Sequence, residues 1–496
     1  MRFALRCLGS GLVMLALTAA TYANPILPGD HPDPTVVHAR GAYYLSATTS
    51  AWAPLFPIFR STDLVNWREV GAVLPVAPTW ATGRFWAPEL SFDRGRFVAF
   101  YSAARDDGGP CIGVATAARA EGPWRDRGRA ACPRGGAIDP FAFRDGRGGR
   151  WLAWKARGPY GGIRLQRLDG RGLRVRGHSI LAVRPDERWE QDVTEGPAIV
   201  RRGATYYLFY AGGHCCRPPC TYAEGVARAP SPAGPWEKAP GPVLAGNDAF
   251  RCPGHGTVLD LGARGLWLVH HAYVADDVFD VRRQVLLTRL TFDPDGWPVA
   301  AGGPPIQAVA PLGRGQAPEG VGFSDAFGGS RLRPGWEWLF DRPPAVAVAG
   351  SALALRCTGR MAFVARQVPV DRWIATATVD ARAAASGADT GLAANLGRGV
   401  RGVELTRAGV RAFTASPDGV QVGPLLRLAR AQTVRLAVSV APGGTLATYT
   451  ATGNGPLRPV PPGPAARGST PTRVALTCRH RGVARFLSTR VRALAG

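Results

Sequence analysis

The run Tyr206-Tyr207-Leu208-Phe209-Tyr210 consists of five consecutive aromatic and apolar residues, which is typical of a buried β-strand. Comparable runs occur at four other places: Tyr43-Tyr44-Leu45, Phe97-Val98-Ala99-Phe100-Tyr101, Trp151-Leu152-Ala153-Trp154 and Leu266-Trp267-Leu268-Val269. The first residues of the five runs are separated by 54, 54, 55 and 60 positions. Five near-equal units of short strands predict a five-bladed β-propeller, since each blade needs neighbours to cover its faces. A β-sandwich with fortuitous spacing is the alternative.

A second marker follows four of the five runs and supports the same period. It is a tryptophan next to a turn residue, found in Asn66-Trp67, Gly122-Pro123-Trp124, Gly234-Pro235-Trp236 and Gly296-Trp297-Pro298. The third unit lacks this tryptophan.

Beyond the repeat, residues 301–318 are rich in Pro, Gly and Ala and are expected to form a linker. Strand patterns continue after it, as in Trp373-Ile374-Ala375-Thr376-Ala377-Thr378-Val379, and no long helical period appears. We therefore expect an all-β chain, with a propeller over residues 24–300 and a β-sandwich over residues 319–496.

The composition agrees with strands and turns and excludes several other classes of protein. The 496 residues include 63 Gly, 43 Pro and 14 Trp, which opposes coiled coils, helix bundles and disorder. The net charge is +24, from 60 basic and 36 acidic residues, and only Lys155 and Lys238 are lysines. The arginines are scattered without a basic run, so we expect no nucleic-acid partner. A cationic surface could still attract an acidic polymer.

The first 23 residues have the pattern of a secretory signal peptide. Arg2 and Arg6 precede an apolar stretch from Leu8 to Leu17, and Ala23 supplies a small residue at the expected cleavage site. The stretch is too short to span a bilayer, and no later segment is long and apolar enough. The mature chain is therefore expected to be secreted or periplasmic, without membrane insertion.

Eight cysteines remain after the signal peptide, and an even number in an exported chain indicates disulfides. We expect pairs between Cys111 and Cys132 and between Cys357 and Cys478. The other four are Cys215, Cys216, Cys220 and Cys252, with His214 and His255 close in sequence. Because no Cys-x-x-Cys pair occurs, we favour two disulfides over a zinc site, with the pairing left open.

Ionisable residues recur at a similar distance before each strand run. Asp33, Glu89, Asp139, Glu195 and His255 precede their runs by 10, 8, 12, 11 and 11 residues. In a propeller the first strand of each blade lines the channel, so residues at one phase should converge at one end of the axis. A single Asp-Pro is usually turn chemistry, but four acids in register with a repeat indicate a functional site.

Converging carboxylates are suited to glycoside hydrolysis. One carboxyl must donate a proton to the leaving oxygen, and another must stay ionised. A third acid can raise the pKa of the donor by repulsion between like charges. Trp86 and Phe141 could stack on a sugar ring, although packing between blades is at least as good an explanation for either.

Taken together, these motifs resemble glycoside hydrolase family 43, whose catalytic domain is a five-bladed propeller. The resemblance is carried by the following segments: Asn24-Pro25-Ile26-Leu27, His31-Pro32-Asp33-Pro34, Trp86-Ala87-Pro88-Glu89, Ile138-Asp139-Pro140, Glu195-Gly196-Pro197 and Gly254-His255-Gly256. The segment from Phe323 to Pro344 resembles the start of the concanavalin-like sandwich that follows the propeller in β-xylosidases of this family.

The resemblance implies a role for each of these residues. Asp33 matches the general base, Glu195 the general acid, and Asp139 the residue that tunes the pKa of the acid. Family members invert the anomeric configuration, so Asp33 and Glu195 should lie about 6.5–9.5 Å apart. His255 matches a channel histidine beside a calcium ion, which would complete its shell with waters. Arg283 aligns more loosely with a substrate-contacting arginine of the family, although it could equally be a surface arginine. Glu89 is a further candidate for substrate binding. No organic cofactor is implied.

The expected substrate is a xylose- or arabinose-containing plant cell-wall polysaccharide or its oligosaccharides. The sandwich favours exo action, as a β-xylosidase or α-L-arabinofuranosidase, because in such relatives it can close one side of the active site. It could also be a carbohydrate-binding module or a stabilising appendage. An endo-acting arabinanase, a non-catalytic carbohydrate-binding propeller and a retaining fructoside-cleaving propeller are the alternatives.

Overall fold

The computed structural model describes residues 20–158, 161–216, 219–275, 282–312, 322–385, 387–395, 399–441, 444–463 and 471–494. Most of the expected signal peptide, residues 1–19, lies outside them, as do residues 313–318 of the expected linker. Among the described residues, no helix is long and apolar enough to cross a membrane.

Residues 35–299 form the propeller, which in the described part of the chain has five four-stranded antiparallel sheets. In each sheet the strands follow chain order. Blade 1 holds β2 (Thr35–Ala39), β3 (Ala42–Ser46), β5 (Leu55–Ser61) and β6 (Arg68–Leu74), and blade 2 holds β7 (Gly83–Asp93), β8 (Arg96–Ala104), β9 (Pro110–Ala117) and β10 (Arg125–Ala131). Blade 3 holds β11 (Ala137–Arg144), β12 (Arg150–Ala156), β13 (Gly162–Leu168) and β14 (Val175–Val183), blade 4 holds β15 (Thr194–Arg202), β16 (Thr205–Gly212), β17 (Ala223–Ala229) and β18 (Glu237–Lys238), and blade 5 holds β19 (Phe250–Asp260), β20 (Leu266–Val274), β21 (Gln284–Phe292) and β22 (Pro298–Val299). Short 3-10 helices lie at Arg188–Glu190 and Gly262–Arg264.

The strand runs found in the sequence are the second strands of the blades, because β3, β8, β12, β16 and β20 contain them. Their alternate side chains pack against both neighbouring blades, which explains why nearly all of each run is buried. The first strands β2, β7, β11, β15 and β19 contact one another in a closed ring. The expected five-bladed propeller is therefore confirmed, with the first strands around its axis.

The C-terminal region is a β-sandwich, as expected. One sheet holds β26 (Ala345–Ala349), β27 (Ala352–Thr358), β38 (Arg481–Ala493), β29 (Trp373–Asp380), β34 (Thr433–Val440), β35 (Leu446–Thr452) and β36 (Arg458–Pro459), with β24 (Phe323–Asp325) beside β38. The other holds β28 (Ala362–Gln367), β37 (Arg473–Arg479), β30 (Asp389–Asn395), β31 (Val400–Thr406), β32 (Gly409–Ser416) and β33 (Gly419–Val422). The short helix α1 (Ala381–Ala385) follows β29. Alternate residues of β29 are buried, and Trp373, Leu476 and Phe486 belong to the shared core.

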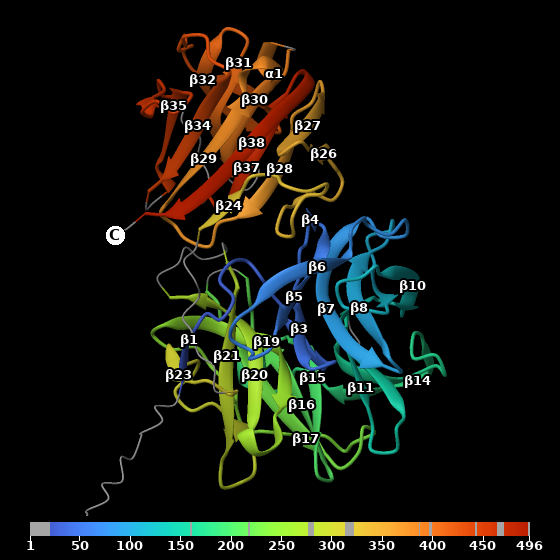
Figure 1. The fold of residues 1–496 in the computed structure, drawn as a ribbon. Helices are drawn as coiled ribbons and strands as arrows, with labels where there is room; N and C mark the ends of the chain where they lie inside the picture. The colour runs from blue at the N-terminus through green and yellow to red at the C-terminus, as the bar shows by residue number, and fades with distance from the viewer. Residues whose placement is uncertain are drawn as a thin grey trace, which may run out of the picture.

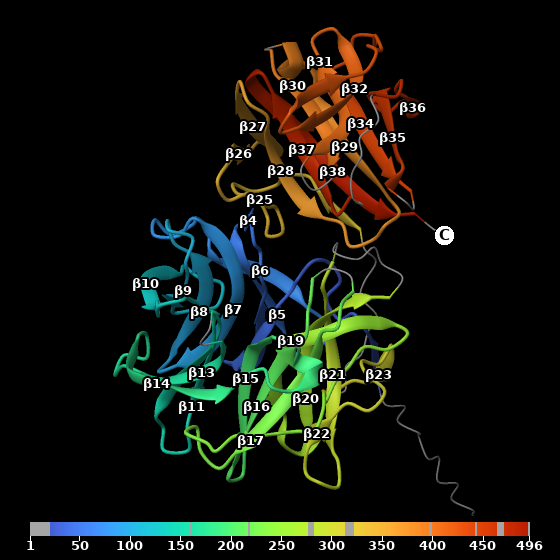
Figure 2. The same cartoon turned by 180° about the vertical axis from the view of Figure 1, so that it is seen from behind.

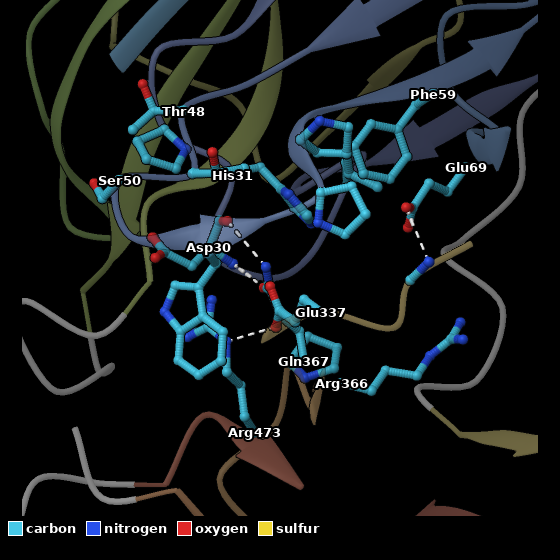
Figure 3. Close-up of a pocket in the computed structure, with 18 of the residues that line it drawn as sticks. Asp30, His31, Thr48, Ser50, Phe59, Glu69, Glu337, Arg366, Gln367 and Arg473 are labelled. Carbon is cyan, nitrogen blue, oxygen red and sulfur yellow. Dashed lines mark hydrogen bonds and ion pairs between the residues drawn. The ribbon is translucent and has the colours of Figure 1, made fainter. Parts of the chain in front are cut away.

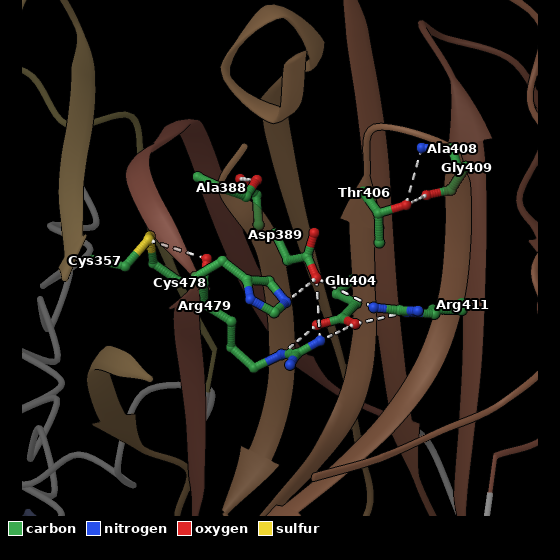
Figure 4. A network of polar contacts seen from close by, with 12 residues as sticks. Cys357, Ala388, Asp389, Glu404, Thr406, Ala408, Gly409, Arg411, Cys478 and Arg479 are labelled. Atoms are coloured by element: carbon green, nitrogen blue, oxygen red, sulfur yellow. Dashed lines mark hydrogen bonds and ion pairs between the residues drawn. A yellow bond between two sulfur atoms is a disulfide. The ribbon is translucent and has the colours of Figure 1, made fainter. Parts of the chain in front are cut away.

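An ion-pair network crosses four neighbouring strands of the six-stranded sheet (Figure 4). Arg479 donates to Glu404 at 2.6 and 2.9 Å and to Asp389 at 3.1 Å. Arg411 donates to the same two carboxylates, at 2.8 and 3.2 Å. Glu404 is 1% exposed, so its charge depends on these partners for compensation.

Two small sheets connect distant parts of the chain. β1 (Thr21–Ala23) pairs with β23 (Gln307–Val309), and the Tyr22 hydroxyl donates to the Leu287 carbonyl at 2.6 Å. β4 (Trp52–Ala53) of the propeller pairs with β25 (Trp338–Leu339) of the C-terminal region. The sandwich therefore packs on the propeller beside β4, as Figures 1 and 2 show.

All four disulfides join described cysteines. Cys111–Cys132 and Cys357–Cys478 are the two expected pairs. The remaining four cysteines form Cys215–Cys216 and Cys220–Cys252, so the disulfide interpretation is confirmed over a zinc site.

Candidate active site

In each blade, a residue just before or within the first strand has a left-handed backbone at a corresponding position of the repeat. These residues and their φ angles are Asp33 (55°), Ala87 (43°), Asp139 (55°), Gly196 (56°) and His255 (48°). In the last four blades a β-bulge lies at the same place, and a bulge redirects a side chain. Left-handed backbone is costly for residues other than glycine and is concentrated at functional sites. The repeat thus carries a strained position at one end of the channel.

The second blade departs from the sequence-based expectation, because Ala87 occupies this position and Glu89 lies two residues later. Glu89 is 4% exposed, and its carboxyl accepts hydrogen bonds from the Thr35 hydroxyl at 2.7 Å and from the Ala142 backbone. Burial raises its pKa to about 8. These contacts give Glu89 a packing role between blades rather than the converging position expected for it.

The environment of Asp33 holds its carboxyl in the ionised form. Oδ1 is 3.0 Å from the Arg283 guanidinium, and Oδ2 accepts a hydrogen bond from the Thr48 hydroxyl at 2.7 Å. The backbone N–H of Asp33 donates to His271 Nδ1 at 3.1 Å. Burial by itself would raise the pKa of Asp33, but the charges of Arg283, His255 and His271 and the hydrogen bond from Thr48 together hold the pKa well below its usual range. Arg283 is therefore a site residue and not a surface arginine.

Both oxygens of Glu195 accept hydrogen bonds from neighbouring strands. Lys155 Nζ, on β12, is 2.5 Å from Oε2, and the Tyr222 hydroxyl, just before β17, is 2.8 Å from Oε1. Burial would raise the pKa of Glu195, but the charge and hydrogen bond of Lys155 hold it below its usual value. The Glu195 carboxylate is thus stabilised in its ionised form.

Asp139 has the opposite environment, although it lies close to Glu195. Its backbone N–H donates to Ser102 Oγ at 2.9 Å, and its Oδ2 accepts from the Gly196 N–H at 3.2 Å. Burial, reinforced by the negative charge of Glu195, raises its pKa to about 6. The Asp139–Glu195 pair therefore retains one proton up to about pH 6, and that proton resides mainly on Asp139.

His255 lies close to all three acids, Asp33, Asp139 and Glu195. Its Nδ1 is 3.4 Å from Asp33 Oδ1, and one of its ring nitrogens lies within 4.8 Å of carboxylate oxygens of Asp139 and Glu195. Gly196 must be glycine here, because a Cβ would lie 2.6 Å from the His255 ring. Asp33, Asp139, Glu195 and His255 thus converge as the repeat predicted.

Direct binding of calcium by Asp139, Glu195 and His255 does not fit this donor set. Calcium prefers oxygen ligands, whereas His255 offers nitrogen. In addition, the Lys155 ammonium already pairs with Glu195, so a second cation there would be repelled. An ion held beside His255 only through waters stays a prediction.

The two aromatic candidates have different surroundings. Phe141 is 9% exposed and belongs to the hydrophobic core of blades 3 to 5, so blade packing explains it. Trp86, beside Ala87 on β7, is half-buried, and the Arg84 guanidinium lies 5.7 Å from its ring centroid. Of the two, only Trp86 keeps accessible ring surface for a sugar.

Lys155, Tyr222, Thr48 and His271 were not found from the sequence. One signal could have identified Lys155. The chain has two lysines among 60 basic residues, and both pair with glutamates of low exposure: Lys155 pairs with Glu195, and Lys238 pairs with Glu190 at 2.8 Å. In a chain that otherwise uses arginine, the rare lysines are the positions to inspect for an ion pair that suits a compact ammonium.

Tyr222 is held by a cross-blade disulfide. Cys220, two residues before it, bonds to Cys252 on β19, and the Tyr222 ring stacks on His271 with centroids 5.8 Å apart. A Cβ on Gly254 would lie 2.9 Å from the Tyr222 ring. The ring therefore has little room to move away from Glu195.

A cavity of about 390 Å³ lies between the propeller and the sandwich, next to the Asp33 side of the site (Figure 3). It is lined by Thr48 and Arg283, which contact Asp33, and by Trp52 of β4. The sandwich contributes Gln367 and Arg473, among others. The C-terminal domain therefore reaches the immediate surroundings of Asp33.

Comparison with known proteins gives a consistent result. The sequence profile described as "Glycosyl hydrolases family 43" matches residues 22–298. The extracellular exo-α-(1→5)-L-arabinofuranosidase ArbA of Cellvibrio japonicus is 29% identical over 58% of this chain and 91% of its own length. The xylosidase/arabinosidase 43B of Humicola insolens is 31% identical over 50% of this chain, but this covers only 48% of that protein.

Solved structures resemble both domains together. BlXynB of Bacillus licheniformis superposes with a TM-score of 0.80 at 20% identity, over 96% of this chain and all of that one. The xylan β-1,4-xylosidase of Bacillus halodurans gives 0.77 at 22% identity, over 95% of this chain and all of that one. At this identity the likeness shows a shared propeller-and-sandwich fold.

Proposed function

The chain belongs to glycosyl hydrolase family 43, and on this premise we propose that it is an exo-acting, inverting β-xylosidase or α-L-arabinofuranosidase. Its substrates would be xylose- or arabinose-containing plant polysaccharides or their oligosaccharides. One observation carries the proposal: an ionised Asp33 faces an Asp139–Glu195 pair that retains a proton. Two carboxyl groups with pKa values driven apart are the requirement for acid–base hydrolysis of a glycoside.

In this mechanism Asp33 accepts a proton from the water that attacks the anomeric carbon. Arg283 and Thr48 fix the two Asp33 oxygens, so the carboxylate is oriented before substrate binds. Glu195 gives its proton to the leaving oxygen. Because water attacks directly, the anomeric configuration is inverted, and the expected Asp33–Glu195 separation of about 6.5–9.5 Å leaves room for that water.

The partners of Glu195 suit the end of the reaction. Once Glu195 has donated its proton it is a carboxylate, and Lys155 and Tyr222 stabilise that form. The sequence predicted that Asp139 raises the pKa of Glu195, but the pKa of Glu195 is lowered and that of Asp139 is raised. In this mechanism Asp139 therefore holds the proton of the pair until Glu195 takes it up for the leaving group. The stabilisation is therefore greatest as the proton is lost, which lowers the barrier to bond cleavage.

Exo action is supported by the position of the sandwich, which borders the cavity beside Asp33, and by ArbA, a relative named for exo action. We also propose export of the mature chain, since four disulfides require an oxidising compartment and ArbA is named extracellular.

A substrate screen tests this proposal. The purified enzyme is assayed on aryl β-D-xylosides, aryl α-L-arabinofuranosides, xylan and arabinan, and the products are sized. The proposal expects monosaccharide release and at least about a 100-fold loss in Asp33→Asn and Glu195→Gln. The exposed Asp418→Asn serves as control. Oligosaccharide products from arabinan would instead identify an endo-arabinanase.

A further inference from the structure

The sandwich is hydrogen-bonded to the loop that carries Asp33. Gln367, the last residue of β28, accepts from the Asp30 backbone N–H at 2.8 Å and donates to the Asp30 carbonyl at 3.3 Å (Figure 3). The approach is close, because a Cβ on Gly29 would lie 3.0 Å from Gln367 Oε1. Asp30 in turn accepts from the Arg283 backbone N–H at 3.3 Å. Gln367 therefore contacts the loop that precedes Asp33, and Asp30 links this contact to the Arg283 backbone.

A second contact reaches the same ion pair through the neighbouring arginine. Arg282, which is 2% exposed, pairs with Asp371 of the sandwich and donates to the Val368 carbonyl at 3.3 Å. Arg283, the next residue, pairs with Asp33. Two adjacent arginines thus connect the sandwich to the proposed catalytic base.

The other Asp33 oxygen, Oδ2, accepts a hydrogen bond from Thr48. Thr48 donates to Asp33 Oδ2 through its hydroxyl and to the Pro32 carbonyl through its backbone N–H, at 2.7 and 2.9 Å. The chain that follows Thr48 pairs with the C-terminal region through β4 and β25, and the Phe340 N–H donates to the Ala51 carbonyl at 2.9 Å. Both oxygens of Asp33 are therefore bound by residues that lie within a few positions in sequence of contacts with the C-terminal region.

We propose that the sandwich is a positioning domain for Asp33, with Gln367 and Asp371 as its positioning residues. Neither side chain contacts Asp33 directly. Gln367 binds Asp30, which accepts a hydrogen bond from the Arg283 backbone, and Asp371 pairs with Arg282, the residue before Arg283. The left-handed backbone of Asp33 explains the need, since a strained conformation persists only where surrounding contacts impose it. The inference rests on the proposed role of Asp33 as general base.

Positioning of the base has a specific kinetic signature. Misplacing a reacting group by about 1 Å can cost about 100-fold in rate, while binding of the sugar is retained. A defect at Asp33 affects attack by water, so it should be the same for good and poor leaving groups. A defect at Glu195 should grow as the leaving group becomes poorer.

The test compares Gln367→Ala and Asp371→Asn with the wild-type full-length enzyme on aryl glycosides of graded leaving-group pKa. We expect kcat to fall about tenfold with KM within about twofold, and the loss to be independent of the leaving group. Gln367→Glu, which keeps an acceptor for the Asp30 N–H but loses the donor, should be intermediate. Gln421→Ala and Asp418→Asn, exposed on the same domain, are matched controls and should leave kcat unchanged.

Circular dichroism and the unfolding temperature establish that the variants are folded at the assay temperature. A kcat within twofold of wild type in both variants would overturn the inference. So would a loss that grows with leaving-group pKa, because it would place the defect at Glu195. Failure of the proposed function itself looks different: the wild type would then hydrolyse none of the glycosides.

Discussion

Replacing Lys155 with methionine should raise the pH at which the enzyme loses activity. The ammonium lies 2.5 Å from Glu195 Oε2, and both side chains are more than four-fifths buried. An opposite charge this close lowers a carboxyl pKa by about one to three, equivalent to about 1.4–4 kcal/mol. Without it, the Asp139–Glu195 pair keeps its proton at higher pH.

The assay is the pH dependence of kcat/KM from pH 4 to 9 on an aryl glycoside. In the wild type the alkaline limb should lie near pH 6, the pKa of Asp139. In Lys155→Met the limb should move upward by about one to three pH units. Lys155→Arg keeps the charge and should leave the limb close to the wild-type position.

The free energy of unfolding of Lys155→Met gives a second measurement, and the direction of its change can be predicted. The lowered pKa of Glu195 stabilises the fold above the unfolded carboxyl pKa, and this contribution is lost as pH falls through the folded pKa. Lys155→Met should therefore lower the free energy of unfolding at pH 7 by about 1.4–4 kcal/mol. Lys238→Met is the matched control, because it also leaves a glutamate without its lysine partner, and this glutamate, Glu190, is not one of the three site acids. It should lose stability without moving the limb. An unmoved or downward-moving limb in Lys155→Met would refute the assignment of Lys155.

Three further predictions follow from the geometry. Tyr222→Phe removes the 2.8 Å hydrogen bond to Glu195, worth about 1.5–3 kcal/mol, so kcat/KM on poor leaving groups should fall tenfold or more; an unchanged leaving-group dependence would contradict this. The mature chain should begin at or before Thr21, because β1 is paired with β23 and Tyr22 is 1% exposed. The intact mass of the mature protein checks this, and an N-terminus at Asn24, which the sequence pattern indicates, would contradict it. Arg479→Met should lower the free energy of unfolding by about 3–5 kcal/mol in urea titrations, because Glu404 is left buried and undercompensated, while kcat at 25 °C stays unchanged.

The fold was predictable because the period was carried by large aromatic side chains. A blade cannot bury its second strand alone, so the Tyr206–Tyr210 run and its counterparts must be apolar along their whole length. The same logic does not apply to β1 and β23. Their pairing joins residues nearly 300 positions apart and has no periodic signal, so the sequence suggested a signal peptide end and a linker instead.

The acids of the site were predictable, but their exact register and their partners were not. Intervals of 8 to 12 residues cannot separate Glu89 from Ala87, because the position is defined by a left-handed backbone at a bulge. Lys155 and Tyr222 come from other strands and approach Glu195 only after the blades pack together. Gln367 comes from another domain, and no local pattern relates it to Asp33.

The stereochemistry of hydrolysis tests the central claim most directly. Proton NMR, recorded from the first seconds of the reaction on whichever aryl glycoside is hydrolysed, identifies the anomer of the released sugar before mutarotation. If Asp33 activates water, the first product is the inverted anomer, and Asp33→Asn abolishes its formation. A first product of retained configuration would require a covalent intermediate and would contradict the assignment of Asp33 as general base.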